Sequence, residues 1–228
     1  ADFAGQQPVR PETVQSWEIG FKGQALDNRL NFNLAAFRAR YTDLQVQATQ
    51  QVNGAPISIP TNAGSSLTKG IELEASFRPT DAMSFFGGVT YLSARFDADG
   101  LPCTLPSQNG AVTVAPGAAN PVNTCFRLGT ARVQNIRNGI LPNSPDWKAN
   151  LSARYDQPIT DNLNGFLQIN GNYQSRVLFD LTQDQVLDQP GFATVDVSVG
   201  LATADDRYNL TLLSLIHISE PTRQAEIS

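Results

Sequence analysis

Apolar and polar residues alternate strictly along several segments of this chain, and no other feature constrains the fold as much. The clearest segment is 147–155, WKANLSARY, in which every odd position holds an apolar or aromatic residue. Similar alternation runs through 17–22, 71–77 and 193–201. Successive side chains of a β-strand point to opposite faces, so a period of two predicts strands with one apolar and one polar face. The pattern therefore predicts an all-β fold.

We predict about eight antiparallel strands that pair with their sequence neighbours in an up-and-down meander. Their expected ranges are 13–24, 29–46, 66–78, 83–96, 146–157, 163–177, 190–201 and 206–213. In the second of these the apolar phase slips near Ala35 and Ala36, which indicates a β-bulge. The first and last strands need not pair, so an open, curved sheet is expected.

The connections fall into two classes, short and long, that alternate along the chain. Short ones with turn residues occupy 26–29, 79–82, 160–162 and 203–206, and long ones occupy 47–65, 97–144 and 177–190. Hairpins with short turns at one end and long loops at the other are typical of outer-membrane β-barrels. No run of about 18 apolar residues exists, which excludes a transmembrane helix. The strands of a membrane barrel instead average to a polar composition, in agreement with the slightly negative mean hydropathy.

The two strand faces predict a wet interior and a lipid-facing exterior. Charged and amide side chains at the polar positions would line the lumen; they are Glu18, Lys22, Glu72, Glu74, Lys148, Asn150 and Arg154. Aromatic residues near the expected strand ends would form the girdles at the two membrane interfaces; they are Trp17, Tyr41, Tyr91, Trp147, Tyr155 and Tyr173.

Several phrases of the sequence resemble the C-terminal barrel of TonB-dependent receptors. They are PETVQSWEIGFKG (11–23), RLNFNLAAFRARYTDLQVQ (29–47), TNAGSSLTKGIELEASFRPT (61–80), LPNSPDWKANLSARY (141–155) and YNLTL (208–212). The resemblance implies a plugged barrel of the 22-strand type, of which this chain supplies about eight strands. It further implies energised uptake of a bulky, scarce solute: a metal chelate, a cobalamin-like cofactor or an oligosaccharide. The implied partners are outer-membrane lipid and a periplasm-spanning energiser protein, reached through an N-terminal plug.

Both ends of the chain suggest that it is a fragment. We expect residues 1–212 to be part of a barrel whose plug, signal peptide and final strands lie outside this sequence. Residues 213–223, LSLIHISEPTR, resemble the in-frame translation of a transposase adapter used in sequencing libraries. We therefore expect residues 213–228 to be a non-native tail without an evolved role, although its apolar residues can extend the last strand.

The long connection 97–144 holds two further predicted features. Cys103 and Cys125 are expected to form a disulfide that clips the loop and stabilises it by about 3 kcal/mol. Arg127, Arg132 and Arg137 are candidate ligand-binding residues for an anion such as a metal chelate. They could equally pair with lipopolysaccharide phosphates or with nothing specific.

The sequence argues against an enzyme. The sole histidine, His217, lies in the expected tail, so no base remains for Ser-His-Asp or Cys-His chemistry. Glu72 and Glu74 could in principle act as paired carboxylates, but lumen lining is the favoured interpretation. No metal or cofactor site is expected, and the net charge of −5 gives no basic surface for nucleic acid. Two other classes stay open: a passive porin, and a soluble β-sandwich for adhesion or carbohydrate binding.

Overall fold

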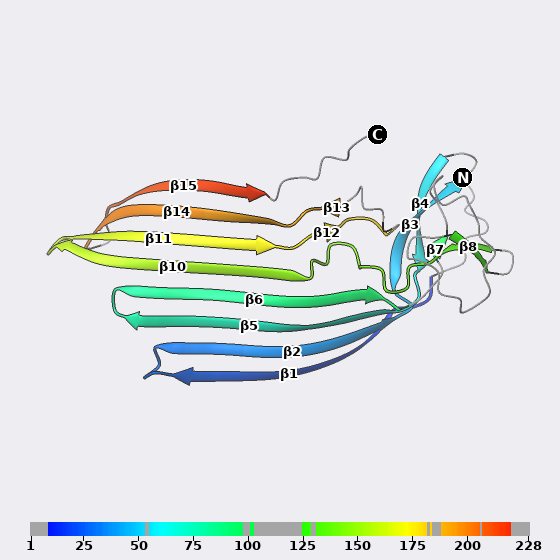
Figure 1. Cartoon of the computed structure of the whole chain (residues 1–228), viewed down its shortest axis with the longest axis horizontal. Helices are drawn as coiled ribbons and strands as arrows, with labels where there is room; N and C mark the ends of the chain where they lie inside the picture. The colour runs from blue at the N-terminus through cyan, green and yellow to red at the C-terminus, as the bar shows by residue number, and fades with distance from the viewer. Residues whose placement is uncertain are drawn as a thin grey trace, which may run out of the picture.

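Eight long antiparallel strands form one sheet in this computed structural model, which describes residues 9–52, 55–97, 101–102, 125–128, 131–181, 183, 188–205 and 207–219. In sheet order they are β1 (Thr13–Ala25), β2 (Leu30–Thr42), β5 (Ser66–Thr80), β6 (Met83–Phe96), β10 (Trp147–Thr160), β11 (Leu163–Gln174), β14 (Phe192–Thr203) and β15 (Asn209–Ser219). This order confirms the predicted meander, with β1 and β15 at the two edges (Figure 1).

The short turns all lie at one end of the sheet, as predicted (Figure 1). The turn between β1 and β2 places Leu26, Asp27 and Asn28 in succession in the left-handed region, with φ values of 55°, 52° and 64°. Asp and Asn tolerate this conformation better than other side chains with a Cβ. The Arg29 N–H donates to the Leu26 carbonyl at 3.0 Å and closes the turn.

The opposite end carries the long connections, which contain short strands that we predicted as loop. β3 (Gln45–Val52) pairs with β4 (Ala55–Asn62), β7 (Leu101–Pro102) and β8 (Cys125–Leu128) flank β9 (Ala131–Gln134), and β12 (Val177–Leu178) pairs with β13 (Asp188–Gln189). The prediction of one strand over 29–46 was also wrong. β2 ends at Thr42 because Asp43 adopts a positive φ of 56°, which extended backbone does not allow.

The predicted β-bulge near Ala35 and Ala36 was wrong as well. β2 pairs with β1 and β5 in continuous register through both residues. The apolar phase changes for another reason: toward the loop end, Phe37 and Tyr41 lie on the otherwise polar face of the sheet, opposite Gly70 and Ser66. The slip in the sequence marks a place where the apolar residues move from one face of the sheet to the other. It does not mark an extra residue.

The small buried core explains that exchange. It lies at the loop end, where the fully or almost fully buried Ala63, Phe96 and Ile136 pack together. Partly buried residues from all three long connections surround them; these are Leu44, Val46, Leu141 and Leu181. Phe96 lies on the same face as Tyr41, since both are register partners of Ser66. Among the residues that the structure describes, loop segments therefore cover the polar face of the sheet only at this end.

Most of the remaining sheet has neither face covered. Large apolar side chains such as Trp17, which is 74% exposed, and Leu151 stand free on one face. No helix in the described part of the chain is long and apolar enough to cross a membrane.

Candidate functional site

The polar face of the sheet is the candidate site. Residues paired directly across antiparallel strands lie on the same face. The register therefore puts all the predicted lumen-facing side chains together on one face: Glu18, Lys22, Glu72, Glu74, Lys148, Asn150 and Arg154. One row crosses six neighbouring strands and is polar at every position that has a side chain: Lys22, Asn33, Glu74, Gly88, Asn150 and Asn172.

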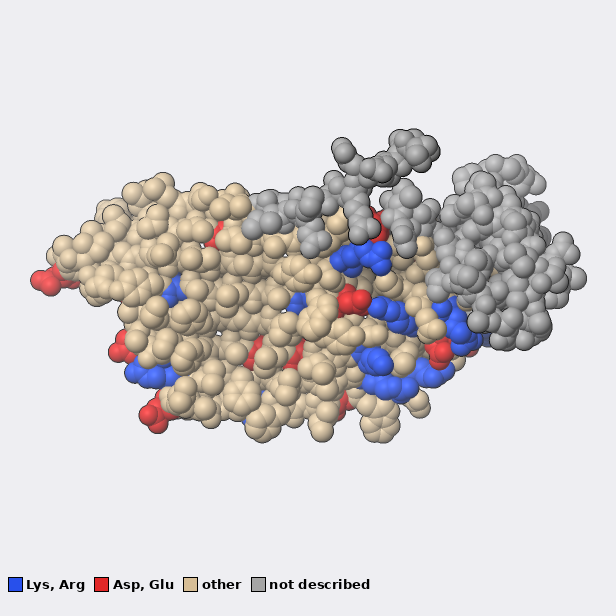
Figure 2. Space-filling view, in the orientation of Figure 1, with Lys and Arg blue, Asp and Glu red and all other residues tan. Residues whose placement is uncertain are grey.

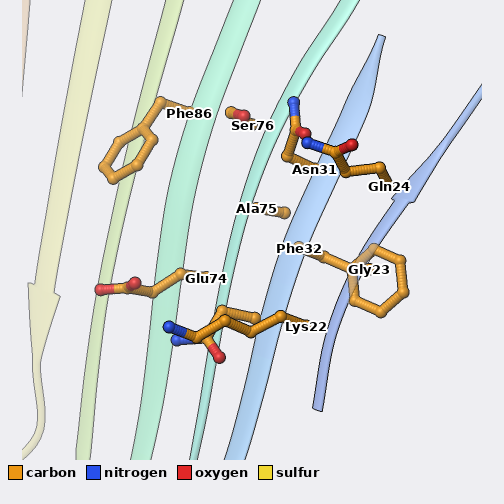
Figure 3. Close-up of a pocket in the computed structure, with 10 residues that line it drawn as sticks. Lys22, Gly23, Gln24, Asn31, Phe32, Glu74, Ala75, Ser76 and Phe86 are labelled. Carbon is orange, nitrogen blue, oxygen red and sulfur yellow. The ribbon is translucent and has the colours of Figure 1, made fainter. Parts of the chain in front are cut away.

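Two hollows lie on this polar face. The first, of about 720 Å³, is lined by Lys22, Gln24, Asn31, Glu74 and Ser76 among others. In Figure 3 the side chains of Lys22 and Glu74 project from β1 and β5 into the same region. The second hollow, of about 440 Å³, is lined by residues of β5, β6, β10, β11 and β14, and Glu74 borders both.

Gly88 makes room between the two sides of the second hollow. A Cβ at this position would lie 2.9 Å from the Asn150 Oδ1 atom and 3.7 Å from Cγ of Glu74. The absence of a side chain leaves room for the Asn150 amide oxygen beside Gly88. The face thus presents carboxylate, ammonium and amide groups, which donate and accept hydrogen bonds.

Arg154 lies at the turn end of the same face, and its guanidinium is held by neighbouring side chains of the sheet. Its Nε is 3.0 Å from both carboxylate oxygens of Asp156, and Nη2 donates to Oδ1 at 2.8 Å. Nη1 donates to the Gln168 amide oxygen at 3.2 Å, and the guanidinium carbon lies 4.1 Å from the centre of the Phe166 ring. With these contacts Arg154 joins β10 to β11 and is poorly placed to bind a solute.

The opposite face is apolar and holds no acidic residue on any of the eight strands. The ring centroids of Tyr91 and Trp147 lie 4.8 Å apart near its loop end, with the two ring planes tilted by 46°, and Tyr155 lies near its turn end. From Trp147 to Tyr155 the strand rises roughly 27 Å, which a tilt of about 40° reduces to about 21 Å, close to the thickness of a barrel's apolar band. Five of the six predicted girdle residues lie on the apolar face, whereas the prediction for Tyr41 was wrong because it lies on the polar face.

Together, an exposed apolar face, a polar opposite face and turns sorted by length define the class: the wall of an outer-membrane β-barrel. Residues 1–215 match the family model described as TonB dependent receptor-like, beta-barrel. The chain belongs to this family of outer-membrane proteins, as its sequence motifs predict.

Two relatives match part of the chain. The chain is 29% identical over 153 residues to the probable TonB-dependent siderophore receptor PiuA of Acinetobacter baumannii, covering 67% of this chain and 17% of the relative. It is 30% identical over 104 residues to the ferric-pyoverdine 358 receptor of Pseudomonas putida, covering 45% of this chain and 12% of the relative. The chain thus spans less than a fifth of either relative.

Solved structures share the fold. The crystal structure of PiuA from Acinetobacter baumannii superposes with a TM-score of 0.60 at 22% identity, covering 92% of this chain and 25% of that one. The ferric yersiniabactin uptake receptor FyuA from Yersinia pestis gives a TM-score of 0.58 at 19% identity, covering 89% and 24%.

The predicted ligand-binding arginines are only partly located. Arg127 and Arg132 are direct backbone partners in the β8–β9 pairing. Arg137 lies beyond β9, where its Nη1 is 3.3 Å from Oδ1 of Asp97. Cys103 falls outside the described residues, so the disulfide with Cys125 stays a prediction; mass spectrometry of the non-reduced and reduced protein would test it. A two-dalton difference between the two forms is expected.

Ion pairs hold the loop end together, and no sequence pattern predicts them. Figure 2 shows Lys and Arg side chains gathered at this end of the molecule. Among the described pairs, Arg40 is 2.7 Å from Asp97 and Arg95 is 2.7 Å from Asp146. Ahead of β1, Arg10 donates to Asp43, which raises the pKa of the guanidinium above its ordinary value through the hydrogen bond and the opposite charge.

A second tie joins two of the long connections without any charge. The Gln183 amide donates to the Ile140 carbonyl at 2.8 Å and accepts from the Ile140 N–H, also at 2.8 Å. The side-chain amide of Gln183 thus takes the place of the backbone groups that would pair with Ile140 in a β-bridge. No local sequence pattern could have predicted it, because the two residues are far apart in the chain.

Proposed function

We propose that this chain is part of the barrel wall of an outer-membrane receptor that takes up a ferric siderophore or a similar bulky metal chelate. The observation that carries the proposal is the polar face, on which charged and amide side chains cross the sheet in register. Such a face requires water, while the opposite face requires lipid, so we assign the polar residues to a wet lumen.

The siderophore assignment is supported by the names of the relatives, which are a siderophore receptor and a ferric-pyoverdine receptor. A cobalamin-like cofactor or an oligosaccharide is less well supported. We propose that uptake is driven by a periplasm-spanning energiser protein, which engages a plug outside this chain. The chain's own role is to line the passage, and no catalytic step is assigned to it. No group of His, Cys, Asp or Glu in the described part could hold a metal ion.

The test of transport uses the full-length receptor in a bacterial strain that lacks its own siderophore receptors. Uptake of an iron-55-labelled siderophore panel is measured with and without the energiser gene. We expect energiser-dependent uptake of at least one ferric siderophore. Energiser-independent entry of small hydrophilic solutes would instead support a passive porin.

The test of the lumen assignment uses cysteine labelling in membranes. Single Glu74→Cys and Lys148→Cys variants, made after replacing Cys103 and Cys125 by serine, should react with a water-soluble maleimide. Leu151→Cys is the matched control, because it lies on the same strand as Lys148 but on the apolar face. Equal labelling of all three variants would contradict the assignment.

We further propose that residues 213–228 are not part of the receptor. β15 continues to Ser219, but its register places Leu213 and Leu215 on the polar face, opposite Ser198 and Asp196. Native strands of this sheet keep large aliphatic residues off that part of the face. Replacing the tail by the natural continuation of the gene should restore polar residues at both positions.

A further inference from the structure

Four basic residues are the only charged side chains on the apolar face of the eight strands, and they gather at its loop end. The register places them in two adjacent rows on β2, β5 and β6. The outer row runs through Arg40, Leu67 and Arg95, and the inner row runs through Arg38 and Lys69.

The two rows differ in how their charges are balanced. Arg40 and Arg95 are paired with loop carboxylates, Asp97 and Asp146, at 2.7 Å each. The side chains of Arg38 and Lys69 are exposed and make no ion pair or hydrogen bond within the part of the chain that the structure describes. They are also direct cross-strand partners. Like charges in this position repel each other and destabilise a sheet. A bound anion would remove this repulsion.

The depth of this pair indicates where such an anion would come from. Trp17 lies in the same row as Arg38, and Tyr91 lies one row closer to the centre of the apolar band. Aromatic side chains of membrane proteins collect at the level of the lipid headgroups. The long loops of outer-membrane barrels lie on the extracellular side, so this is the level of the outer leaflet.

We propose that Arg38 and Lys69 bind a phosphate of a lipopolysaccharide headgroup from the outer leaflet. The guanidinium and the ammonium together would surround the phosphate, and the acyl chains would lie along the exposed apolar residues below, among them Ile71. A free phosphate ion would gain nothing from that apolar surface. The inference rests on the membrane orientation of the barrel and not on which solute the receptor transports.

The test measures lipid binding by native mass spectrometry of the full-length receptor in detergent. The probes are lipid A with both phosphates, chemically dephosphorylated lipid A, and inorganic phosphate. The test variant is Arg38→Gln with Lys69→Gln, and the matched control is Arg78→Gln with Arg207→Gln, which removes two positive charges at the turn end. Gel mobility before and after heating reports whether each variant is folded.

Wild type and the turn-end control should bind phosphorylated lipid A equally. The Arg38→Gln, Lys69→Gln variant should bind it roughly thirtyfold more weakly, about fivefold for each cation lost near a membrane surface. Exchanging the two residues (Arg38→Lys with Lys69→Arg) keeps both charges and should keep most of the affinity, which separates charge from folding.

Other outcomes would overturn the proposal. If dephosphorylated lipid A bound wild type as tightly, the phosphate would not be recognised and the two side chains would merely reach into water. If millimolar inorganic phosphate displaced the lipid, the site would be one for a free ion. If the turn-end control lost as much affinity as the test variant, general charge and not this pair would govern binding. Siderophore uptake plays no part in these measurements, so their failure is distinct from failure of the proposed function.

Discussion

Replacing Gly70 by alanine should lower the free energy of unfolding by about 3 kcal/mol, the upper part of the range for overpacking a filled site. An added Cβ would overlap the carbonyl oxygen of Tyr91 and lie 2.7 Å from Cζ of Phe37. Phe37 is the direct cross-strand partner of Gly70, and its ring lies over the glycine. The ring can turn aside, but the carbonyl belongs to β6 and can move only if the β5–β6 pairing is disturbed.

Alanine substitutions at two other glycines of the same sheet provide a comparison for the cost expected at Gly70. Gly171→Ala is the control, because nothing lies within 4 Å of the new methyl group, and its cost should stay below about 0.5 kcal/mol. For Gly23→Ala the three atoms nearest to the added Cβ are all ring atoms of Phe32, the nearest at 2.5 Å. A ring can rotate where a backbone carbonyl cannot, so we expect a cost of about 1 kcal/mol at Gly23.

The measurement is a guanidinium titration of the full-length receptor in lipid vesicles, followed by tryptophan fluorescence and by heat-dependent gel mobility. The predicted order of cost is Gly70→Ala, then Gly23→Ala, then Gly171→Ala. Equal destabilisation by all three would refute the steric argument, because lost glycine flexibility would then explain the data as well as crowding does.

Three further predictions concern the tie between the loops, a turn and the wall. Gln183→Leu removes both hydrogen bonds to Ile140, so amide exchange at Ile140 should become about tenfold faster or more, whereas unchanged exchange would show that the tie is dispensable. The Thr203 hydroxyl holds the pKa of Asp205 below its ordinary value, so this carboxylate favours the folded turn above the unfolded pKa and loses that effect as the pH falls through the lowered value. Thr203→Val should raise the pKa of Asp205 toward normal in a carbon-13 NMR titration, and an unmoved titration would contradict this cause. Arg154→Lys keeps the charge but loses the planar fork, and should cost about 1 kcal/mol in the same guanidinium titration; a wild-type midpoint would argue that charge alone suffices.

Local pattern was sufficient to predict the strands and their faces. The segment 146–157 was predicted as a strand and is observed as Trp147–Thr160. Lys148 and Glu72 were assigned to a polar face before their strands were placed, and both are there, since alternation decides the face once the strand is known. The β3–β4 pairing was missed although Asn53 and Gly54 stand between two β-prone runs, a hairpin signal that the sequence did contain.

The sequence by itself determined the strands, the turns and the family, because these depend on residues close together in the chain. Only the tertiary structure decided that Phe37 lies on the polar face, that Gln183 ties one loop to another and that Arg38 stands opposite Lys69. The physical reason is that cross-strand register and loop packing are set by contacts between distant segments. Shifting a strand by two residues keeps the same side chains on the same face, so alternation within a segment does not decide the register. The order of charges across the sheet is therefore known only once the strands are paired.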